Sequence, residues 1–316
     1  MSDTPARTAV VALGGNALSP PGERSTIADQ FRHTRESLAP IVDLARDGWR
    51  ICVVHGNGPQ VGDELVRNEV ARNIVEPLPL GVLVAATAGW IGYMIQQSLE
   101  NALRKAGAER PVTTIITQVQ VDPSDPALRN PSKFIGHSIP EQRAKELIAE
   151  GHSVKKDSNG MYRRVVGSPA PLSIHDLEII RPLTETGTVV IACGGGGVPV
   201  YTHPVRDLEG IDAIIDKDAV AAVLARELSA DLLLILTNVD AVYADWGTSS
   251  KRPLSRLTVA EARALDARGA FGEGSMAPKV RAAVDYVTAT GGRAIVAELS
   301  QGMEAVHGRA GTTIAR

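Results

Sequence analysis

Four short apolar runs rich in β-branched residues lead into glycine, asparagine or threonine, and this repeated pattern constrains the fold more than any other feature. The runs span residues 8–13, 50–54, 189–192 and 231–237. Continuous apolar runs of this length are typical of strands buried on both faces of a parallel sheet. Helical patterns lie between them, so the sequence predicts an α/β fold with a mainly parallel sheet.

Glycine clusters follow three of these runs and predict a site for an anion. The clusters are residues 14–16, residues 56–58 and the glycines at 194–197. The carboxyl ends of parallel strands lie at one edge of a sheet, so the clusters should face one crevice. Glycine amides approach an anion closely, although any single cluster is also compatible with an ordinary tight turn.

Charged residues accompany the glycines at two predicted helix starts. Asp216, Lys217 and Asp218 open one helix, and Lys279 follows Pro278 at the start of another. The lysines could supply positive charge to a phosphate, while the aspartates could hold the lysines or simply cap the helix. A further lysine, at position 133, stands in a loop, where most lysines are only solvated.

Composition and missing motifs exclude several classes of protein. The formal net charge is −3 and aromatic residues make up 3% of the chain, which argues against binding to nucleic acid or to an anionic membrane. The sequence lacks the spacings of a P-loop, a dinucleotide-binding turn, a serine hydrolase elbow and a zinc protease. The histidines show no metal-ligand spacing, so metal ligands are unknown at this point.

The chain is expected to be cytoplasmic. Residues 1–8 lack the basic and apolar parts of a secretion signal. The apolar stretch at 78–95 is interrupted by glycines and predicts a core helix rather than a membrane span. Cys52 and Cys193 lie in apolar runs and are interpreted as buried structural thiols.

The remaining patterns predict the layout of the chain. One long helix is expected at about 27–47 and another at 80–105, where small residues favour close packing and a dimer interface. A β-rich run follows at 111–119. Residues 121–168 begin with a long aperiodic loop and continue into a hairpin pattern, which predicts a small protruding subdomain. A further helix is expected at 172–186.

Phosphoryl transfer fits this inventory of residues. The reaction needs alignment and positive charge around the phosphoryl oxygens, which glycine amides, lysines and Mg²⁺ supply. No general base stands out in the sequence, whereas lysines are in surplus. Both features favour an acceptor that is already an anion. Such an acceptor needs no general base, but it needs extra positive charge because two anions must be brought together.

Seven segments carry a family resemblance, in order along nearly the whole chain. The most specific are HGNGPQVG at 55–62, NPSKFIG at 130–136 and GGGGVPV at 194–200. The others are GGNAL at 14–18, IDKD at 215–218, TNVDAVY at 237–243 and GSMAPK at 274–279. Together they resemble the carbamate kinases, which are members of the amino acid kinase superfamily.

The resemblance implies a three-layer α/β/α sandwich around a mainly parallel central sheet. It divides the chain into an acceptor lobe at 1–213, with the protruding subdomain at about 121–168, and a nucleotide-binding lobe at 214–316. The implied reaction is reversible phosphoryl transfer between ATP and carbamate, which gives ADP and carbamoyl phosphate and uses Mg²⁺ with the nucleotide. Its implied use is ATP synthesis in the catabolism of arginine or related nitrogen compounds, by a homodimer.

The resemblance also implies roles for individual residues. Lys133, Lys217 and Lys279 are the implied catalytic lysines, and Asp216 is the implied organiser of these lysines. The implied acceptor and phosphate cradle consists of Gly14, Gly15, Asn16, Gly56, Asn57, Gly58, Gly195 and Gly196. The implied nucleotide side consists of Asp218, Thr237, Asn238, Val239, Tyr243 and Met276.

Two alternatives to this enzyme stay open at the level of sequence. A non-catalytic sensor of a small anion or nucleotide could use the same fold, although it would not need the three lysines. A kinase of another small acid would need groups that recognise its side chain, and none is identified. The chain also departs from many family members at Ser132, Phe134 and Ala277, beside the lysines, which leaves the rate and the rigidity of the loop open.

Overall fold

An eight-stranded sheet forms the centre of the computed structural model, which describes residues 6–14, 18–19, 26–157, 159–272 and 276–316. Its strand order is β15-β17-β16-β12-β1-β2-β9-β3, and neighbouring strands run parallel except β16 and β17. The strands are β1 (Thr8–Leu13), β2 (Arg50–His55), β3 (Val112–Thr114), β9 (Val189–Ile191), β12 (Leu232–Thr237), β15 (Arg256–Thr258), β16 (Arg293–Glu298) and β17 (Thr312–Ala315).

Both faces of this sheet are buried, as the apolar runs predict. On β1, Ala9, Val11 and Leu13 pack into one core, and Val10 and Ala12 pack into the other. The first core is covered by α1 (Ile27–Glu36), α2 (Ala39–Arg46), α4 (Leu80–Lys105) and α11 (Gly302–Val306), and the second by α7 (Leu177–Glu185), α8 (Lys217–Glu227), α9 (Val259–Ala267) and α10 (Met276–Thr290). The predicted sandwich of helices around a mainly parallel sheet is therefore confirmed.

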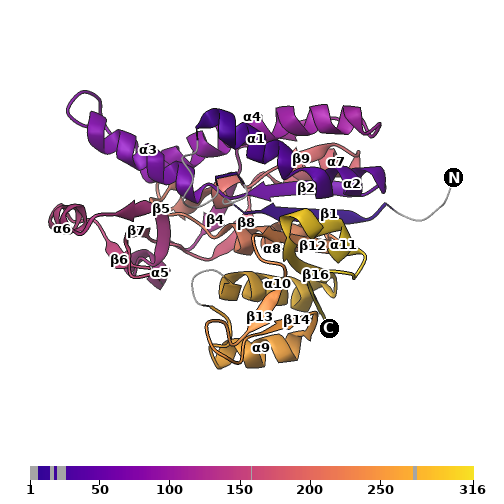
Figure 1. Cartoon of the computed structure of the whole chain (residues 1–316). Helices are drawn as coiled ribbons and strands as arrows, with labels where there is room; N and C mark the ends of the chain where they lie inside the picture. Colours follow the sequence, from indigo (N-terminus) through magenta and orange to yellow (C-terminus); the bar gives the residue numbers. More distant parts are fainter. Residues whose placement is uncertain (1–5, 15–17, 20–25, 158, 273–275) are drawn as a thin grey trace.

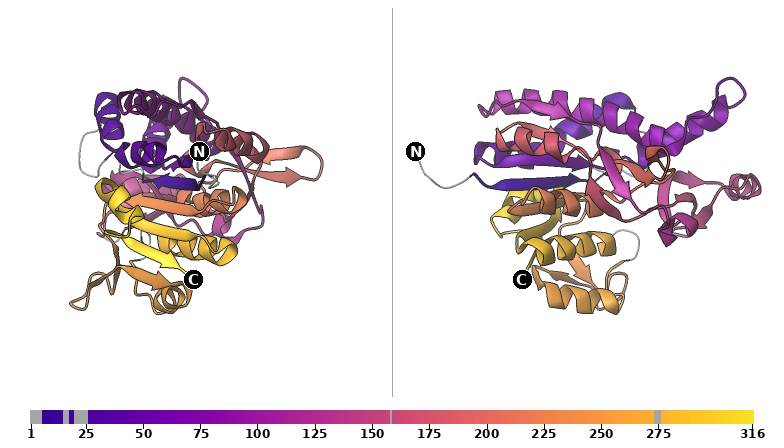
Figure 2. Two further views of the ribbon diagram at one scale, coloured as in Figure 1. Left: turned by 90° about the vertical axis from the view of Figure 1, so that its right-hand side faces the viewer. Right: turned by 180° about the vertical axis from the view of Figure 1, so that it is seen from behind.

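Smaller sheets lie outside the central one. Figure 1 shows one of them, with α5 and α6, extending beside α3 from one end of the molecule, and Figure 2 shows the same extension from behind. This extension contains β5 (Lys133–Ile139), β6 (Val154–Lys156), β7 (Tyr162–Val166), α5 (Pro126–Arg129) and α6 (Glu141–Ala149), and α3 spans Gly58–Ala71. A four-stranded sheet contains β4 (Gln118–Val121), β8 (Pro171–Ile174), β10 (Val198–His203) and β11 (Asp207–Gly210), and β13 (Val242–Ala244) pairs with β14 (Arg252–Leu254).

The helix predicted at 27–47 is two helices, α1 and α2. The break lies at Ser37 and Leu38, where the Ser37 hydroxyl donates to the carbonyl of His33 at 2.7 Å. Pro40 stands in the first turn of α2, where its missing amide donor is tolerated. The prediction of one continuous helix was wrong because this local break interrupts an otherwise helical pattern.

Two further predicted elements are divided in the structure. The run at 111–119 becomes β3 and β4, which belong to different sheets, because Thr117 turns the chain between them. The Thr117 hydroxyl donates to the carbonyl of Ile115 at 2.9 Å and accepts from the amide of Cys193 at 3.0 Å. The helix predicted at 172–186 begins only at Leu177, since β8 takes up the residues before it.

A close backbone contact joins the extension to α3. A methyl group added to Gly62 on α3 would lie 2.1 Å from the Cα of Gly136 on β5. Ile135, next to this contact, packs with Val61 and Val84 in a small separate core. Since Lys133 begins β5, the contact between the two glycines determines where this lysine lies.

We expect Gly62→Ala to destabilise the fold by at least about 2 kcal/mol, because backbone atoms cannot move aside as side chains do. The free energy of unfolding in urea measures the effect. Gly210→Ala is the matched control, since a methyl group there would meet nothing within 4 Å. Equal stability of the two variants would contradict the close contact between α3 and β5.

Candidate active site

A cleft of about 740 Å³ opens at the carboxyl edge of the central sheet. Residues at the ends of β1, β2, β12 and β16 line it, as expected for a ligand site in an open parallel sheet. The first turns of α3, α8 and α10 line it too. Helix N-termini carry partial positive charge, so three of them surround a space suited to anions.

Most of the predicted site residues line this cleft together. Those that do are Gly14, Gly56, Asn57, Gly58, Lys133, Gly195, Asp216, Lys217, Asp218, Thr237, Asn238 and Lys279. Gly196, Val239, Tyr243 and Met276 are not part of its lining. Gly15 and Asn16 lie outside the described residues. The structure thus brings together residues that are more than 200 positions apart in the sequence.

The glycine run packs directly against the turn that follows β2. Gly195 has a φ of 70°, and a methyl group on it would lie 2.3 Å from Nδ2 of Asn57. The same amide nitrogen donates to the hydroxyl of Thr87 on α4 at 2.9 Å. A methyl group on Gly196 would instead lie 2.2 Å from the carbonyl oxygen of Ile215. Gly195 therefore borders the cleft, whereas Gly196 supports the segment that leads into α8.

Two aspartates hold the three predicted lysines in one ionic network. Lys133 pairs with Asp216, while Lys217 and Lys279 both pair with Asp218, the latter at 2.8 Å. The Asp218 side chain is only 3% exposed. The lysines belong to β5, α8 and α10, so the network links three parts of the chain that are distant in sequence.

Asp216 uses its two carboxylate oxygens for different purposes. Oδ1 accepts from the amides of Asp218 and Ala219 at 2.9 and 3.3 Å, which caps the start of α8. Oδ2 accepts from the ammonium group of Lys133. Capping and lysine holding, which were alternatives for the aspartates in the sequence, are therefore both true of Asp216.

The network controls the charge of its members. Burial disfavours the ionised form of Asp218, but Lys217 and Lys279 hold the pKa of this carboxyl well below its usual value. Burial also acts on Lys279, yet the attraction of Asp218 prevails and raises the pKa of this lysine. For Lys217, burial prevails and lowers the pKa. Lys217 is therefore the lysine of this pair that loses its proton first as pH rises.

The cleft lining includes residues that the sequence did not single out, among them Arg163, Glu298 and Ser300. Glu298 ends β16 as Thr237 ends β12, so the strand-end pattern could have found it. Arg163 lies within β7, where no local pattern marks it as a site residue.

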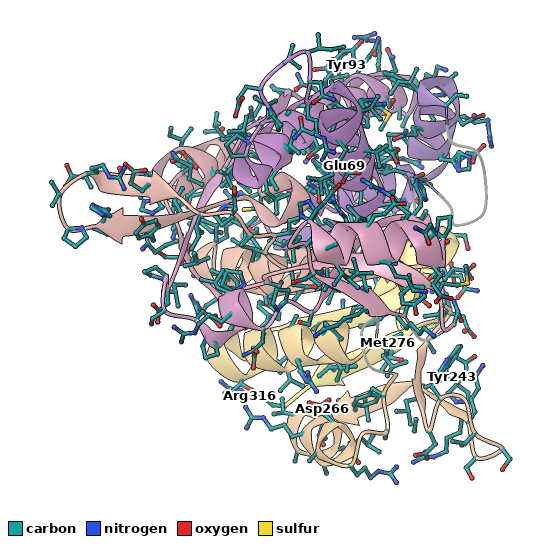
Figure 3. All side chains as sticks on the ribbon, turned by 90° about the vertical axis from the view of Figure 1, so that its left-hand side faces the viewer. Glu69, Tyr93, Tyr243, Asp266, Met276 and Arg316 are labelled. Atoms are coloured by element: carbon teal, nitrogen blue, oxygen red, sulfur yellow. The ribbon has the colours of Figure 1, made fainter. Side chains whose placement is uncertain are left out.

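Tyr243 and Met276 lie in the lower part of the molecule in Figure 3, on β13 and at the start of α10. The Tyr243 hydroxyl donates to Asp240 at 2.9 Å, and its ring meets that of Trp246 edge-on with centroids 5.5 Å apart. The ammonium group of Lys251 lies over both rings, at 4.3 and 3.9 Å from their centroids. The nucleotide role of Tyr243 and Met276 stays a prediction.

The described residues also show whether the chain has metal ligands, disulfide bonds or membrane-spanning helices. Across the described ranges, no cluster of three or more histidine, cysteine or acidic side chains is arranged to hold a metal ion. Cys52 and Cys193 are buried free thiols, as expected. Within the same ranges, none of the helices combines the length and the apolar character that crossing a bilayer requires.

Known proteins resemble this chain over nearly its whole length. The model of the amino acid kinase family matches residues 7–298. The carbamate kinase of Halobacterium salinarum is 47% identical over 308 residues, which cover 96% of this chain and 97% of that protein. Carbamate kinase from Giardia lamblia, solved with citric acid and with AMP-PNP, matches with TM-scores of 0.92 and 0.89 at 36% and 35% identity, covering 98% of both chains in each case. The chain therefore belongs to the amino acid kinase family and, within it, to the carbamate kinases.

Proposed function

We propose that the protein is a carbamate kinase, which reversibly transfers a phosphoryl group between ATP and carbamate to give ADP and carbamoyl phosphate. The observation that carries this proposal is the ionic network of three lysines and two aspartates in the cleft. It lies where three helix N-termini meet, in a chain that belongs to the carbamate kinases.

The network supplies what phosphoryl transfer requires. Lysine ammonium groups and glycine amides can stabilise the charge of the transferred group, and carbamate is already an anion that needs no general base. The aspartates hold the three lysines in place at the cleft. A sensor of a small anion is not favoured, because it would not need three lysines tied into one network.

Two acyl phosphates distinguish a carbamate kinase from a kinase of another small acid. ATP formation from ADP and Mg²⁺ is followed in a coupled assay, once with carbamoyl phosphate and once with acetyl phosphate. We expect the larger kcat/KM with carbamoyl phosphate. ATP formation from acetyl phosphate alone would contradict the choice of substrate.

We propose that Mg²⁺ enters the site with the nucleotide. Both cleft aspartates are occupied by lysines, which leaves them poor ligands for a dedicated metal site. Mg²⁺ is often held by phosphates, water and only one or two carboxylates, so the donor set fits an ion bound mainly to ATP or ADP. The ion would neutralise part of the phosphate charge, while the lysines of this chain hold and orient the phosphoryl group.

We also propose the division into lobes and the setting of the enzyme. Residues before and after position 213 both line the cleft, which supports an acceptor lobe at 1–213 and a nucleotide lobe at 214–316. The two free thiols are typical of a reducing compartment, which supports a cytoplasmic location.

ATP synthesis from carbamoyl phosphate in nitrogen catabolism is the use that we propose for the reaction.

The pH dependence of the reaction should reflect Lys217. This lysine must be protonated to stabilise phosphate charge, and burial lowers its pKa below the ordinary value of 10.5. As pH rises, kcat should therefore fall before an ordinary lysine would lose its proton. Initial rates of ATP formation against pH measure this alkaline limb.

Two variants assign the alkaline limb to one lysine. Lys217→Arg should move it to higher pH, because arginine stays protonated. Lys279→Arg should leave it in place, because the pKa of Lys279 is already raised. A limb that Lys217→Arg does not move would contradict the assignment.

We propose that a second copy of the chain packs on the outer face of α4. Val82, Ala86 and Tyr93 are exposed there in one stripe, and Gly89 between them packs near Ile116, which is 51% exposed. The stripe is uncharged and contains small residues, so an identical helix could approach it closely. Gly92, on the inner side, is small for another reason: a methyl group there would lie 2.2 Å from Thr114 Cγ2.

We expect Tyr93→Glu to convert a dimer into a monomer, because it places a charge in the apolar stripe. Sedimentation velocity measures the mass. Met161→Glu is the control, since Met161 is similarly exposed but lies in the extension. A wild-type monomer, or a dimer that Tyr93→Glu leaves intact, would contradict this interface.

A further inference from the structure

Two adjacent arginines on β7 face opposite sides of the extension. Arg163 lines the active-site cleft. Arg164 lines a separate cavity of about 420 Å³ on the other side of the small sheet. Alternate residues of a strand point to opposite faces, which explains the separation. The two side chains are therefore a natural pair for comparison.

Their electrostatic surroundings differ. The guanidinium group of Arg164 pairs with Glu69 on α3 at 2.5 Å. Arg163 has no carboxylate partner within ion-pair distance among the residues that the structure describes. Each of the three cleft lysines, by contrast, has one. Arg163 is thus the one of these four cleft cations without a carboxylate in ion-pair contact among the described residues, although the more distant Asp157 still attracts it electrostatically.

The contacts of Arg163 fix its guanidinium group without neutralising it. Nη2 donates to the carbonyl of Gly136 at 2.8 Å, and Cζ lies 5.4 Å from the centre of the Phe134 ring. Nε is buried and has no hydrogen-bond partner in the described residues. A partly buried cation with an unsatisfied donor is unfavourable, and burial accordingly lowers the pKa of Arg163. Arg164 has unsatisfied buried nitrogens too, so what sets Arg163 apart is that its charge faces the cleft without a paired carboxylate, where an anionic ligand would offset the cost of its burial.

The position of Arg163 indicates which anion it receives. β7 pairs with β5, where Val166 lies opposite Lys133, so Arg163 and Lys133 belong to the same small sheet. Both reach the cleft from the extension, whereas Lys217 and Lys279 reach it from α8 and α10. The planar fork of a guanidinium group suits carboxylate and phosphate oxygens.

We propose that Arg163 binds the anionic acceptor, which is carbamate in one direction and carbamoyl phosphate in the other. This inference rests on the proposed function. Arg163 and Lys133 then hold the acceptor from the extension, and Lys217 and Lys279 act on the phosphoryl group from α8 and α10. The competing explanation is that Arg163 only supports β5 through its bond to Gly136.

The test compares Arg163→Gln with Arg164→Gln in the coupled assay of ATP formation. We expect Arg163→Gln to raise the KM for carbamoyl phosphate about 10- to 100-fold, the usual worth of a charged hydrogen bond, and to leave the KM for ADP unchanged. Arg164→Gln should lower thermal stability, because it removes a partner of Glu69, and leave both KM values unchanged. An unchanged KM for carbamoyl phosphate in Arg163→Gln, or a parallel rise of both KM values, would overturn the proposal.

Rescue separates binding from support of β5. Guanidinium ion added to Arg163→Ala should lower the raised KM for carbamoyl phosphate, because it can occupy the vacated site. A purely supporting role predicts no rescue, and that result would also overturn the proposal.

The failure of the proposed function is distinguishable from the failure of this inference. If the proposed function fails, the wild-type protein itself will form no ATP from carbamoyl phosphate. Inorganic phosphate then serves as the probe of the anion site, with melting temperature as the readout. Stabilisation of wild type but not of Arg163→Gln would support the site, and equal stabilisation would overturn it.

Discussion

Replacing Lys217 or Lys279 with alanine is expected to lower kcat at least about 100-fold, the usual effect of removing one group that stabilises transition-state charge. Both ammonium groups meet at Asp218, so each lies beside the same buried carboxylate in the cleft. Loss of either lysine removes positive charge that no neighbouring group replaces. Steady-state rates of ATP formation at saturating substrates measure the loss.

A variant with both Lys217→Ala and Lys279→Ala tests whether the two lysines act together. Because both lysines share Asp218, the effects of the two single changes should not be additive. Lys105→Ala, at an exposed position near the end of α4, is the control and should retain wild-type kcat. Near-normal turnover of either single active-site variant would contradict the assignment of these lysines.

Lys133→Ala is expected to lower kcat by a comparable factor of about 100 while ADP still binds. Lys133 reaches the cleft from β5 and pairs with Asp216, whereas the predicted nucleotide residues lie in α8 and in the segments that follow it. The loss should therefore fall on the acceptor and the transferred group. Isothermal titration with ADP, beside the rate of ATP formation, separates the two effects.

The extension offers a matched control for this variant. Lys155 is exposed on β6 of the same small sheet and lies outside the cleft lining, so Lys155→Ala should leave kcat unchanged. Weakened ADP binding in Lys133→Ala, with catalysis otherwise intact, would assign this lysine to the nucleotide side instead.

The sequence predicted the central sheet well because its signals are local. Each apolar run and the polar cluster after it lie within about ten residues, and burial on both faces follows from the composition of the run itself. The glycines after β2 and β9 were predictable for the same reason, since strand ends of a parallel sheet share one edge. The break between α1 and α2 was missed although Pro40, which cannot donate the hydrogen bond of a helix interior, was a local signal for it.

The partners in the cleft could not be predicted, because they depend on contacts between distant parts of the chain. Lys133 and Asp216 are separated by 83 positions, and Lys279 and Asp218 by 61. No pattern in either neighbourhood shows which lysine meets which aspartate. Arg163 was missed for a related reason. Only the fold shows that its side chain lines the cleft and that no carboxylate of the described residues forms an ion pair with it.

The central claim is that the cleft transfers a phosphoryl group directly between the acceptor and the nucleotide. Phosphorus NMR of the wild-type protein with ADP, Mg²⁺ and carbamoyl phosphate tests it most directly. We predict that the carbamoyl phosphate signal decreases while the γ-phosphate signal of ATP increases in equal amount. Release of inorganic phosphate without ATP, or no change beyond the spontaneous decay of carbamoyl phosphate, would contradict the claim.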